Sequence, residues 1–145
     1  MKIIIDADGC PVVKKTEACA HRHGLSCIAV CDICHILNLD YAEIITVDKG
    51  RDSADLKIAS LAEKGDIAVT QDYGLAAMCL AKGAYALNQD GMVYTGDNID
   101  ALLLSRHTAA KIRRSGGRLK GQPKRTSEQD RAFTDALEDM IKNLL

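Results

Sequence analysis

Five short apolar runs alternate with stretches of helical pattern along the chain, and this alternation limits the fold more than any other feature. Each run has five or six residues bounded by turn residues; the runs are 2–6, 25–30, 42–47, 66–70 and 84–88. Continuous apolar strands separated by helices are typical of a parallel sheet buried on both faces. We therefore predict an α/β fold with a mainly parallel sheet of about five strands and helices on both faces. Residues 91–95 add a short strand or the arm of a hairpin.

The composition suits one layered domain over residues 1–145. Of the 145 residues, 47% are hydrophobic and only 3% aromatic, with no Trp, so the core must consist of Ile, Leu, Val and Ala. A capped amphipathic helix is predicted at 127–144. The chain opens without a signal-peptide pattern and has no apolar run long enough to span a bilayer. We expect a soluble cytoplasmic protein without membrane contact.

Acidic residues directly follow two of the predicted strands. Asp6 ends the run that contains three isoleucines, Asp8 comes two residues later, and Asp72 lies just beyond the run 66–70. In sheets covered on both faces, ligands bind at the carboxyl ends of the strands, where the connections change direction. We expect these carboxylates to lie at one edge of the sheet, where they could bind a ligand.

A further carboxylate comes from the helix predicted over residues 53–65. At about 100° per residue, Asp55 falls on the apolar stripe of that helix. An inward carboxylate must be paired, protonated or bound to a cation. Several carboxylates without nearby histidines suit a hard cation, so we predict Mg²⁺ or Mn²⁺ bound by Asp6, Asp55 and Asp72.

Each of these acids also has an ordinary structural interpretation. Asp72 could cap the following helix, and Asp55 could interact with the dipole of its own helix. Asp8 and Asp66 are typical turn residues. Asp6 is the hardest to explain in this way, because it directly ends a buried strand.

Basic residues cluster in one part of a nearly neutral chain. The formal net charge is −1, from 19 basic and 20 acidic residues, yet residues 106–125 contain no acidic residue. Glycines and a proline predict a flexible basic segment at 115–126. Such a segment could follow a phosphate backbone, and its lack of aromatic residues argues against reading bases; a solvated linker is the alternative. The predicted nucleic-acid-binding residues are Arg106, Lys111, Arg113, Arg114, Arg118, Lys120, Lys124 and Arg125.

The six cysteines are expected to be reduced thiols, because a domain that can pack a hydrophobic core does not need disulfide bonds for stability. The stretch "CDICH" at 31–35 matches the pattern of covalent haem attachment, but that chemistry needs export, so no haem is expected. The same stretch offers one metal-ligand pair without a clear second pair. The spacing therefore favours structural cysteines over a zinc site.

Five motifs together resemble the bacterial YaiI/YqxD family, which is grouped with PIN-like domains. The motifs are "DADGCPV", "GRDSADLKI", "GDIAVTQDYGLA", "YTGDNI" and "RRSGGRLKGQPKR". The resemblance covers nearly the whole chain. It implies a three-layer fold similar to the flap endonucleases and an acidic nuclease site that depends on Mg²⁺ or Mn²⁺.

The resemblance also implies roles for individual residues. Asp6 matches the acid that ends the first strand, Asp55 the acid early in a helix, and Asp72 the acid after a later strand. Thr70 matches the residue that orients water or substrate. Asp8 would be a helper, and Asp90 would be the fourth acid, although the family pattern does not firmly place one there. We predict a nuclease acting on RNA or DNA, with RNA the preferred expectation.

A phosphatase of the haloacid dehalogenase type is the main alternative, because Asp-x-Asp-Gly opens its signature. Asp6 would be the nucleophile and Asp8 the acid or base, with Lys82, Asp97 and Asp100 as later motifs. A Cys-Pro pair replaces the expected threonine, and the last two motifs are crowded. A nucleic-acid-binding module with a vestigial acidic site is a third possibility.

Overall fold

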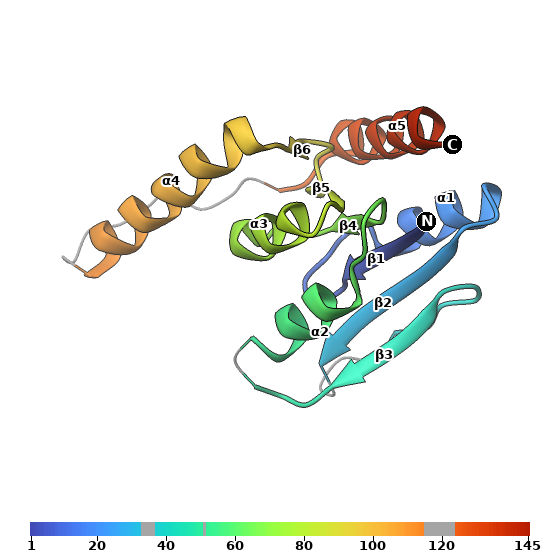
Figure 1. The fold of residues 1–145 in the computed structure, drawn as a ribbon, viewed down its shortest axis with the longest axis horizontal. Helices are drawn as coiled ribbons and strands as arrows, with labels where there is room; N and C mark the ends of the chain where they lie inside the picture. Colours follow the sequence, from blue (N-terminus) through green and yellow to red (C-terminus); the bar gives the residue numbers. More distant parts are fainter. Residues whose placement is uncertain (33–36, 51, 115–123) are drawn as a thin grey trace.

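A computed structural model describes residues 1–32, 37–50, 52–114 and 124–145, with only the backbone described at 106–114 (Figure 1). These parts of the chain form a six-stranded sheet and five helices. In chain order the elements are β1 (Lys2–Asp6), α1 (Val13–Arg22), β2 (Ser26–Asp32), β3 (Glu43–Val47), α2 (Ser53–Leu61), β4 (Ile67–Val69), α3 (Tyr73–Ala81), β5 (Tyr85–Leu87), β6 (Val93–Tyr94), α4 (Gly96–Arg114) and α5 (Ser127–Leu144).

The strands lie in the order β3-β2-β1-β4-β5-β6, and every neighbouring pair is parallel except β5 with β6. The predicted α/β class and mainly parallel sheet are therefore confirmed. The sheet has six strands instead of about five, because residues 91–95 do supply the arm of a hairpin. Asn88 closes that turn by accepting the N–H groups of Asp90 and Met92, each at 2.9 Å.

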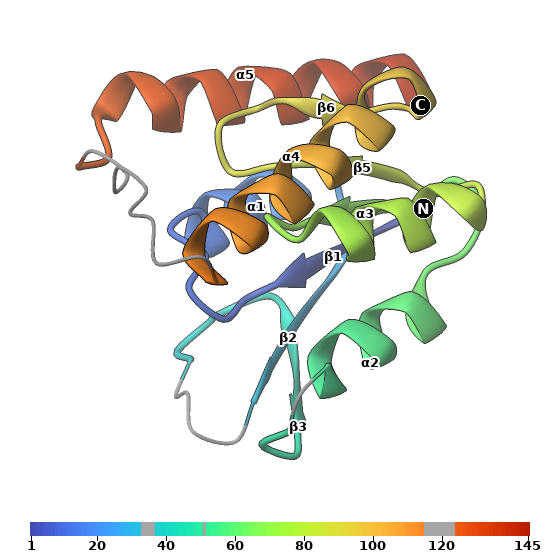
Figure 2. The same ribbon diagram turned by 90° about the vertical axis from the view of Figure 1, so that its left-hand side faces the viewer.

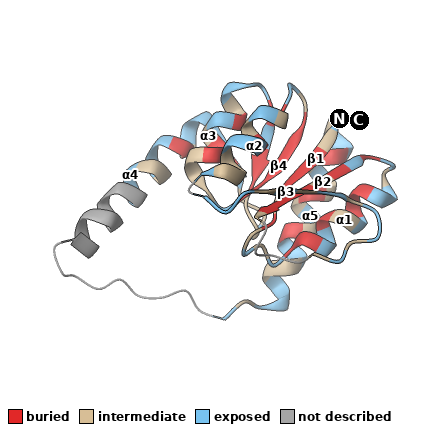
Figure 3. Ribbon diagram, turned by 90° about the horizontal axis from the view of Figure 1, so that it is seen from below, coloured by how far each residue is buried: buried red, intermediate tan, exposed pale blue. Residues whose placement is uncertain are grey.

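Alternate residues of β1 belong to two different core layers. Ile3 and Ile5 pack on one face with α1 and α5, whereas Ile4 packs on the other face with α2 and α3. Figure 3 shows the buried strands between these two helical layers. Helices α2 and α5 accordingly lie on opposite sides of the molecule (Figure 1 and Figure 2). A strand that is apolar at every position is what such a two-sided burial requires.

The two longest helices differ in how they meet the sheet. Helix α5 begins at a capping box between Thr126 and Gln129 and buries Phe133, Leu137 and Ile141 completely, as its amphipathic pattern predicts. Helix α4 begins against α3 and then extends away from the sheet (Figure 1). No helix in the described part of the chain combines the length and hydrophobicity that crossing a membrane would require.

Helix α2 ends earlier than the predicted Gly65. Its last residue is Leu61, and Ala62 is extended and fully buried. The chain turns there because the side chain of Asp66 accepts the N–H of Glu63 at 2.9 Å. Asp66, expected to be a plain turn residue, is in fact buried, with 4% of its surface exposed.

Asp66 joins the start of β1 to the start of β4. Its carboxylate accepts the backbone N–H of Lys2 at 3.1 Å and pairs with the Lys2 ammonium at 2.6 Å. Burial alone would raise the pKa of Asp66, but these hydrogen bonds from Lys2 and Glu63 hold it below its ordinary value. The ionised carboxylate is therefore the form that the fold stabilises.

We expect Asp66→Asn to lower the free energy of unfolding by about 2–4 kcal/mol, since hydrogen bonds to a buried charge are lost. The folded pKa is depressed, so this stabilisation is present above the ordinary pKa of 3.8 and is lost as the pH falls through the lower folded value. Urea denaturation between pH 2 and pH 7 measures both effects, and the variant should lose part of the acid sensitivity.

Glu63→Gln is the matched control. The Glu63 carboxylate lies 3.3 Å from the same ammonium, but its side chain is 78% exposed, so its removal should change stability by less than about 1 kcal/mol. Equal effects of the two substitutions would contradict the role given to Asp66.

Candidate functional site

The central strands β1 and β4 end side by side where the chain changes direction. The β1–α1–β2 connection covers one face of the sheet, and the connection from β3 through α2 to β4 covers the other. The register pairs Ile5 with Val69, so Asp6 lies beside Thr70 at the carboxyl edge. This is the switch point at which ligands of open α/β sheets bind.

Thr70 holds two of the predicted acids in place. Its hydroxyl donates to Asp6 Oδ2 at 2.8 Å and accepts the backbone N–H of Asp72 at 3.0 Å. The buried hydroxyl of Tyr94 donates to the Thr70 carbonyl at 3.1 Å, which fixes the backbone from the hairpin side. Sequence reasoning missed Tyr94, because nothing in the pattern of residues 91–95 shows where its hydroxyl points.

Helix α2 brings Asp55 to the same place. After burial, the charge and hydrogen bonding of the nearby Asp72 are the main causes that raise the pKa of Asp55. Asp72 also caps α3 by accepting the N–H of Leu75 at 3.1 Å. The capping interpretation of Asp72 is thus confirmed and does not remove it from the cluster. We call Asp6, Asp55 and Asp72 the acidic cluster.

The acidic cluster carries more negative charge than its surroundings stabilise. Burial, followed by the charge and hydrogen bond of Asp72, raises the pKa of Asp55 to about 6. Burial also raises the pKa of Asp6; the hydrogen bond from Thr70 opposes this, and the charges of Asp72 and Asp8 add to it. A bound cation would reverse these effects, because it favours the ionised carboxylates.

The three carboxylates of the acidic cluster do not form a ready-made coordination shell. Among the described residues, no three of these carboxylates have oxygens that all lie within 4.8 Å of one another. Mg²⁺ keeps several of its waters and is commonly bound through one or two carboxylates. A cation bound here would therefore have to be held partly through water.

A small hollow beside Asp6 adds an unpaired oxygen. The side-chain Oε1 of Gln89 is buried and has no hydrogen-bond partner, which is uncommon for a buried polar atom. The hollow has a volume of about 20 Å³, enough for one water. Sequence reasoning missed Gln89, which lies in a loop without a recognisable pattern. The residues that line the hollow are Asp6, Asp8, Cys10, Val69, Thr70, Gln71 and Gln89.

Asp8 points toward β2. Its two carboxylate oxygens accept the backbone N–H of Asp32 at 3.3 and 3.1 Å, which ties the loop after β1 to the end of β2. Lys82, the lysine of the phosphatase pattern, donates to the carbonyl of Ala59 at 2.6 Å. It follows α3, which runs back from the acidic cluster, so it lies at the opposite end of that helix from Asp72.

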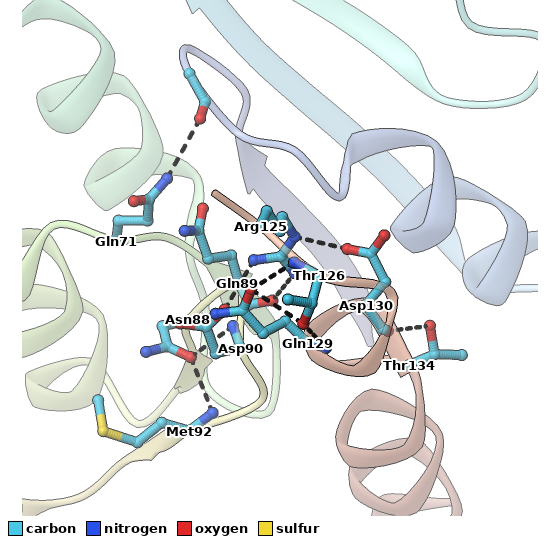
Figure 4. A network of polar contacts seen from close by, with 11 residues as sticks. Gln71, Asn88, Gln89, Asp90, Met92, Arg125, Thr126, Gln129, Asp130 and Thr134 are labelled. Carbon is cyan, nitrogen blue, oxygen red and sulfur yellow. Dashed lines mark hydrogen bonds and ion pairs between the residues drawn. The ribbon is translucent and has the colours of Figure 1, made fainter. Parts of the chain in front are cut away.

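The structure does not bring Asp90 to the acidic cluster. Its carboxylate pairs with Arg125 at 2.7 Å, and Arg125 also pairs with Asp130 at 2.6 Å and donates to the Gln89 carbonyl at 2.5 Å (Figure 4). Arg125 thereby fastens the start of α5 to the turn between β5 and β6. The guanidinium predicted to bind nucleic acid is engaged within the protein.

The other basic residues are only partly described. Lys124 is exposed beside Arg125. The remaining predicted nucleic-acid-binding residues fall where α4 is described only as a backbone, or in 115–123, outside the described residues; they are Arg106, Lys111, Arg113, Arg114, Arg118 and Lys120.

The cysteine prediction is tested in part. The thiols of Cys10, Cys19, Cys27, Cys31 and Cys79 are free. Burial raises the pKa of the Cys10 thiol, so its place before α1 does not activate it. Cys34 and His35 of the "CDICH" stretch lie outside the described residues, and Cys31 is buried in β2.

Residues 4–143 match the sequence model of the family described as "Uncharacterized BCR, YaiI/YqxD family". The chain belongs to this family. Among relatives, it is 50% identical to a "UPF0178 protein" of Ruminiclostridium cellulolyticum, over 98% of this chain and 93% of that protein. It is 52% identical to a protein of the same name from Alkaliphilus oremlandii, over 92% and 86% respectively. No solved structure matches this YaiI/YqxD family member.

Thr70→Val removes the hydroxyl that joins Asp6 to Asp72 and keeps the side-chain shape. We expect the pKa of Asp6 to rise further, because the hydrogen bond from Thr70 acts against burial. The free energy of unfolding should fall by about 1–3 kcal/mol, because the N–H of Asp72 loses its acceptor. Carbon NMR of the carboxyl groups during a pH titration and urea denaturation measure these changes.

Thr134→Val is the control, because the Thr134 hydroxyl donates to the Asp130 carbonyl of its own helix at 3.0 Å. It should leave the titration of Asp6 unchanged. An unaltered Asp6 titration in Thr70→Val would contradict the bridging role.

Proposed function

We propose that the acidic cluster binds Mg²⁺ or Mn²⁺ and that the protein is a PIN-like nuclease acting on RNA or DNA. The convergence of Asp6, Asp55 and Asp72 at the carboxyl ends of β1 and β4 is the observation that carries the proposal. A divalent cation bound there would activate water and stabilise the oxygens of an in-line phosphoryl displacement.

Different residues of the site would have different roles in the reaction. Asp6 and Asp72, both held by Thr70, would supply fixed carboxylates, and Asp55 would complete the cluster from α2. Thr70 is rigid because it is buried and held at its carbonyl, so it could orient a water or a substrate oxygen. Gln89 offers an unpaired oxygen that could accept from a water in the hollow.

A groove next to the hollow at Asp6 supports a polynucleotide substrate, although its lining includes Asp130 and none of the three acids of the cluster. It has a volume of about 580 Å³ and meets the hollow at Cys10. The exposed residues Lys14 and Lys15 line one side of the groove. Leu37 and Leu39 give the groove an apolar surface that a base or a sugar could cover. Cations beside apolar surface suit a single strand whose phosphates and bases must both be held.

The geometry gives less support to the phosphatase alternative. An acid or base at Asp8 would have to give up the N–H of Asp32, and Lys82 lies at the far end of α3. The binding-module alternative uses the same groove and is separated from the nuclease by turnover alone.

The Asp6→Asn, Asp72→Asn double variant should lose at least about 100-fold of the Mn²⁺-dependent cleavage of labelled single-stranded RNA or DNA, because fixed charge at the reacting centre is removed. The assay compares it with Asp97→Asn, Asp100→Asn, which removes two exposed carboxylates of α4 and should retain activity. Turnover of p-nitrophenyl phosphate without polynucleotide cleavage would contradict the proposal, and salt-sensitive binding without turnover would favour the binding module.

Lys14→Ala, Lys15→Ala should weaken binding of single-stranded RNA and lower the slope of log Kd against log salt by up to about 1.4, because two phosphate contacts are lost. Fluorescence anisotropy at several salt concentrations measures both. Lys57→Ala, Lys142→Ala removes two exposed lysines from α2 and α5, away from the groove, and should change neither. Equal losses in the two double variants would show that only net charge matters.

A further inference from the structure

Helices α1 and α5 pack on each other (Figure 3). Three side chains that could ligate a metal come together from these two helices. Cys19 and His23 are four residues apart near the end of α1, so they lie on one face of that helix. Glu138 faces them from α5. Because α1 runs back from the carboxyl end of β1, this group lies at the opposite end of the sheet from Asp6.

The ligand atoms of Cys19, His23 and Glu138 lie almost as close to one another as the ligand atoms of a bound metal ion do. Cys19 Sγ lies 3.2 Å from one carboxylate oxygen of Glu138, and His23 Nε2 lies 2.6 Å from the other. The three ligand atoms lie within 4.8 Å of one another, and no other set of three in the described residues does so. Ligands at zinc bond lengths of about 2.0–2.3 Å stand about 3.3–3.8 Å apart, so small movements suffice.

We propose that Cys19, His23 and Glu138 bind a transition-metal ion of the Zn²⁺ class and clamp α1 to α5. Sulfur and imidazole ligands select such an ion over Mg²⁺ or Mn²⁺. Three protein ligands leave a fourth position for water. The side chains of His23 and Glu138 are 19% and 20% exposed, so the position can be reached from solvent.

The charges balance when the ion binds. Glu138 is ionised, because hydrogen bonds from Arg22 and His23 lower its pKa to about 2. Burial and the neighbouring Glu138 raise the pKa of Cys19 to about 12, so the thiol keeps its proton without metal. Coordination would release that proton to solvent, since a metal deprotonates a bound thiol. The divalent ion, one thiolate and one carboxylate then sum to zero.

Arg22 would compete with the metal ion for the carboxylate of Glu138. Its guanidinium donates to Glu138 Oε1 at 3.2 and 2.5 Å, so an ion pair satisfies Glu138 in the absence of metal. The Arg22 side chain is 54% exposed and can turn into solvent when the ion enters. Removing Arg22 should therefore strengthen metal binding, whereas an ordinary hydrogen-bonded network would only be weakened by it.

Titration of the chelator-treated full chain with Co²⁺ tests the proposal. We expect one equivalent to bind with a sulfur-to-cobalt charge-transfer absorption, and Zn²⁺ to displace it. Cys19→Ser should abolish the absorption, His23→Gln should weaken binding at least tenfold, and Arg22→Ala should tighten it. Cys10→Ser and Asp6→Asn should leave the sulfur-to-cobalt absorption unchanged, which separates this site from the acidic cluster.

Far-ultraviolet circular dichroism checks that each variant is folded. Absence of the charge-transfer absorption in the folded wild-type chain would overturn the proposal, as would its persistence in Cys19→Ser. Binding that Arg22→Ala weakens along with the stability would show that the group is a hydrogen-bonded network only.

Discussion

β1 and β4 pair in parallel at the centre of the sheet, and both the core and the acidic cluster are organised around this pair. The alternation along β1 divides its isoleucines between two helical layers. The same register places Asp6 beside Thr70, whose hydroxyl then reaches Asp72. At the other end of the pair, the Asp66 carboxylate binds Lys2 and fixes where both strands begin. One strand pairing thus sets the positions of core and site together.

The acidic cluster lowers the stability of the metal-free protein. Burial and mutual repulsion raise the pKa of Asp6 and of Asp55, so ionising both costs free energy in the metal-free protein. Such crowding of half-buried carboxylates with raised pKa values is more typical of functional sites than of structural ones. By contrast, hydrogen bonds lower the pKa of the buried Asp66, which therefore contributes to folding. The two ends of the central strands carry carboxylates with opposite physical roles.

The sequence predicted the features that depend on local pattern. Apolar runs and helical periodicity predicted the α/β sheet. Strand ends together with one helical stripe pointed to Asp6, Asp55 and Asp72 as neighbours at one edge of the sheet, and their joint binding of a metal stays a prediction. What it could not predict depends on contacts between distant segments. Asp90 turns to Arg125 because α5 packs beside its loop, and Gln89 of the same loop lines the hollow. The Cys19, His23 and Glu138 group likewise needs α1 and α5 to pack, which no spacing reveals.

Titration of the isotope-labelled protein with Mn²⁺, followed by NMR, tests the central claim most directly. Mn²⁺ broadens signals close to where it binds, and as a hard ion it should prefer the carboxylates over the Cys19 group. The account predicts saturable broadening centred on Asp6, Asp55, Thr70 and Asp72, and its loss in Asp6→Asn, Asp72→Asn. Weak broadening spread over exposed carboxylates such as Asp97 and Asp100, unchanged in that variant, would contradict it.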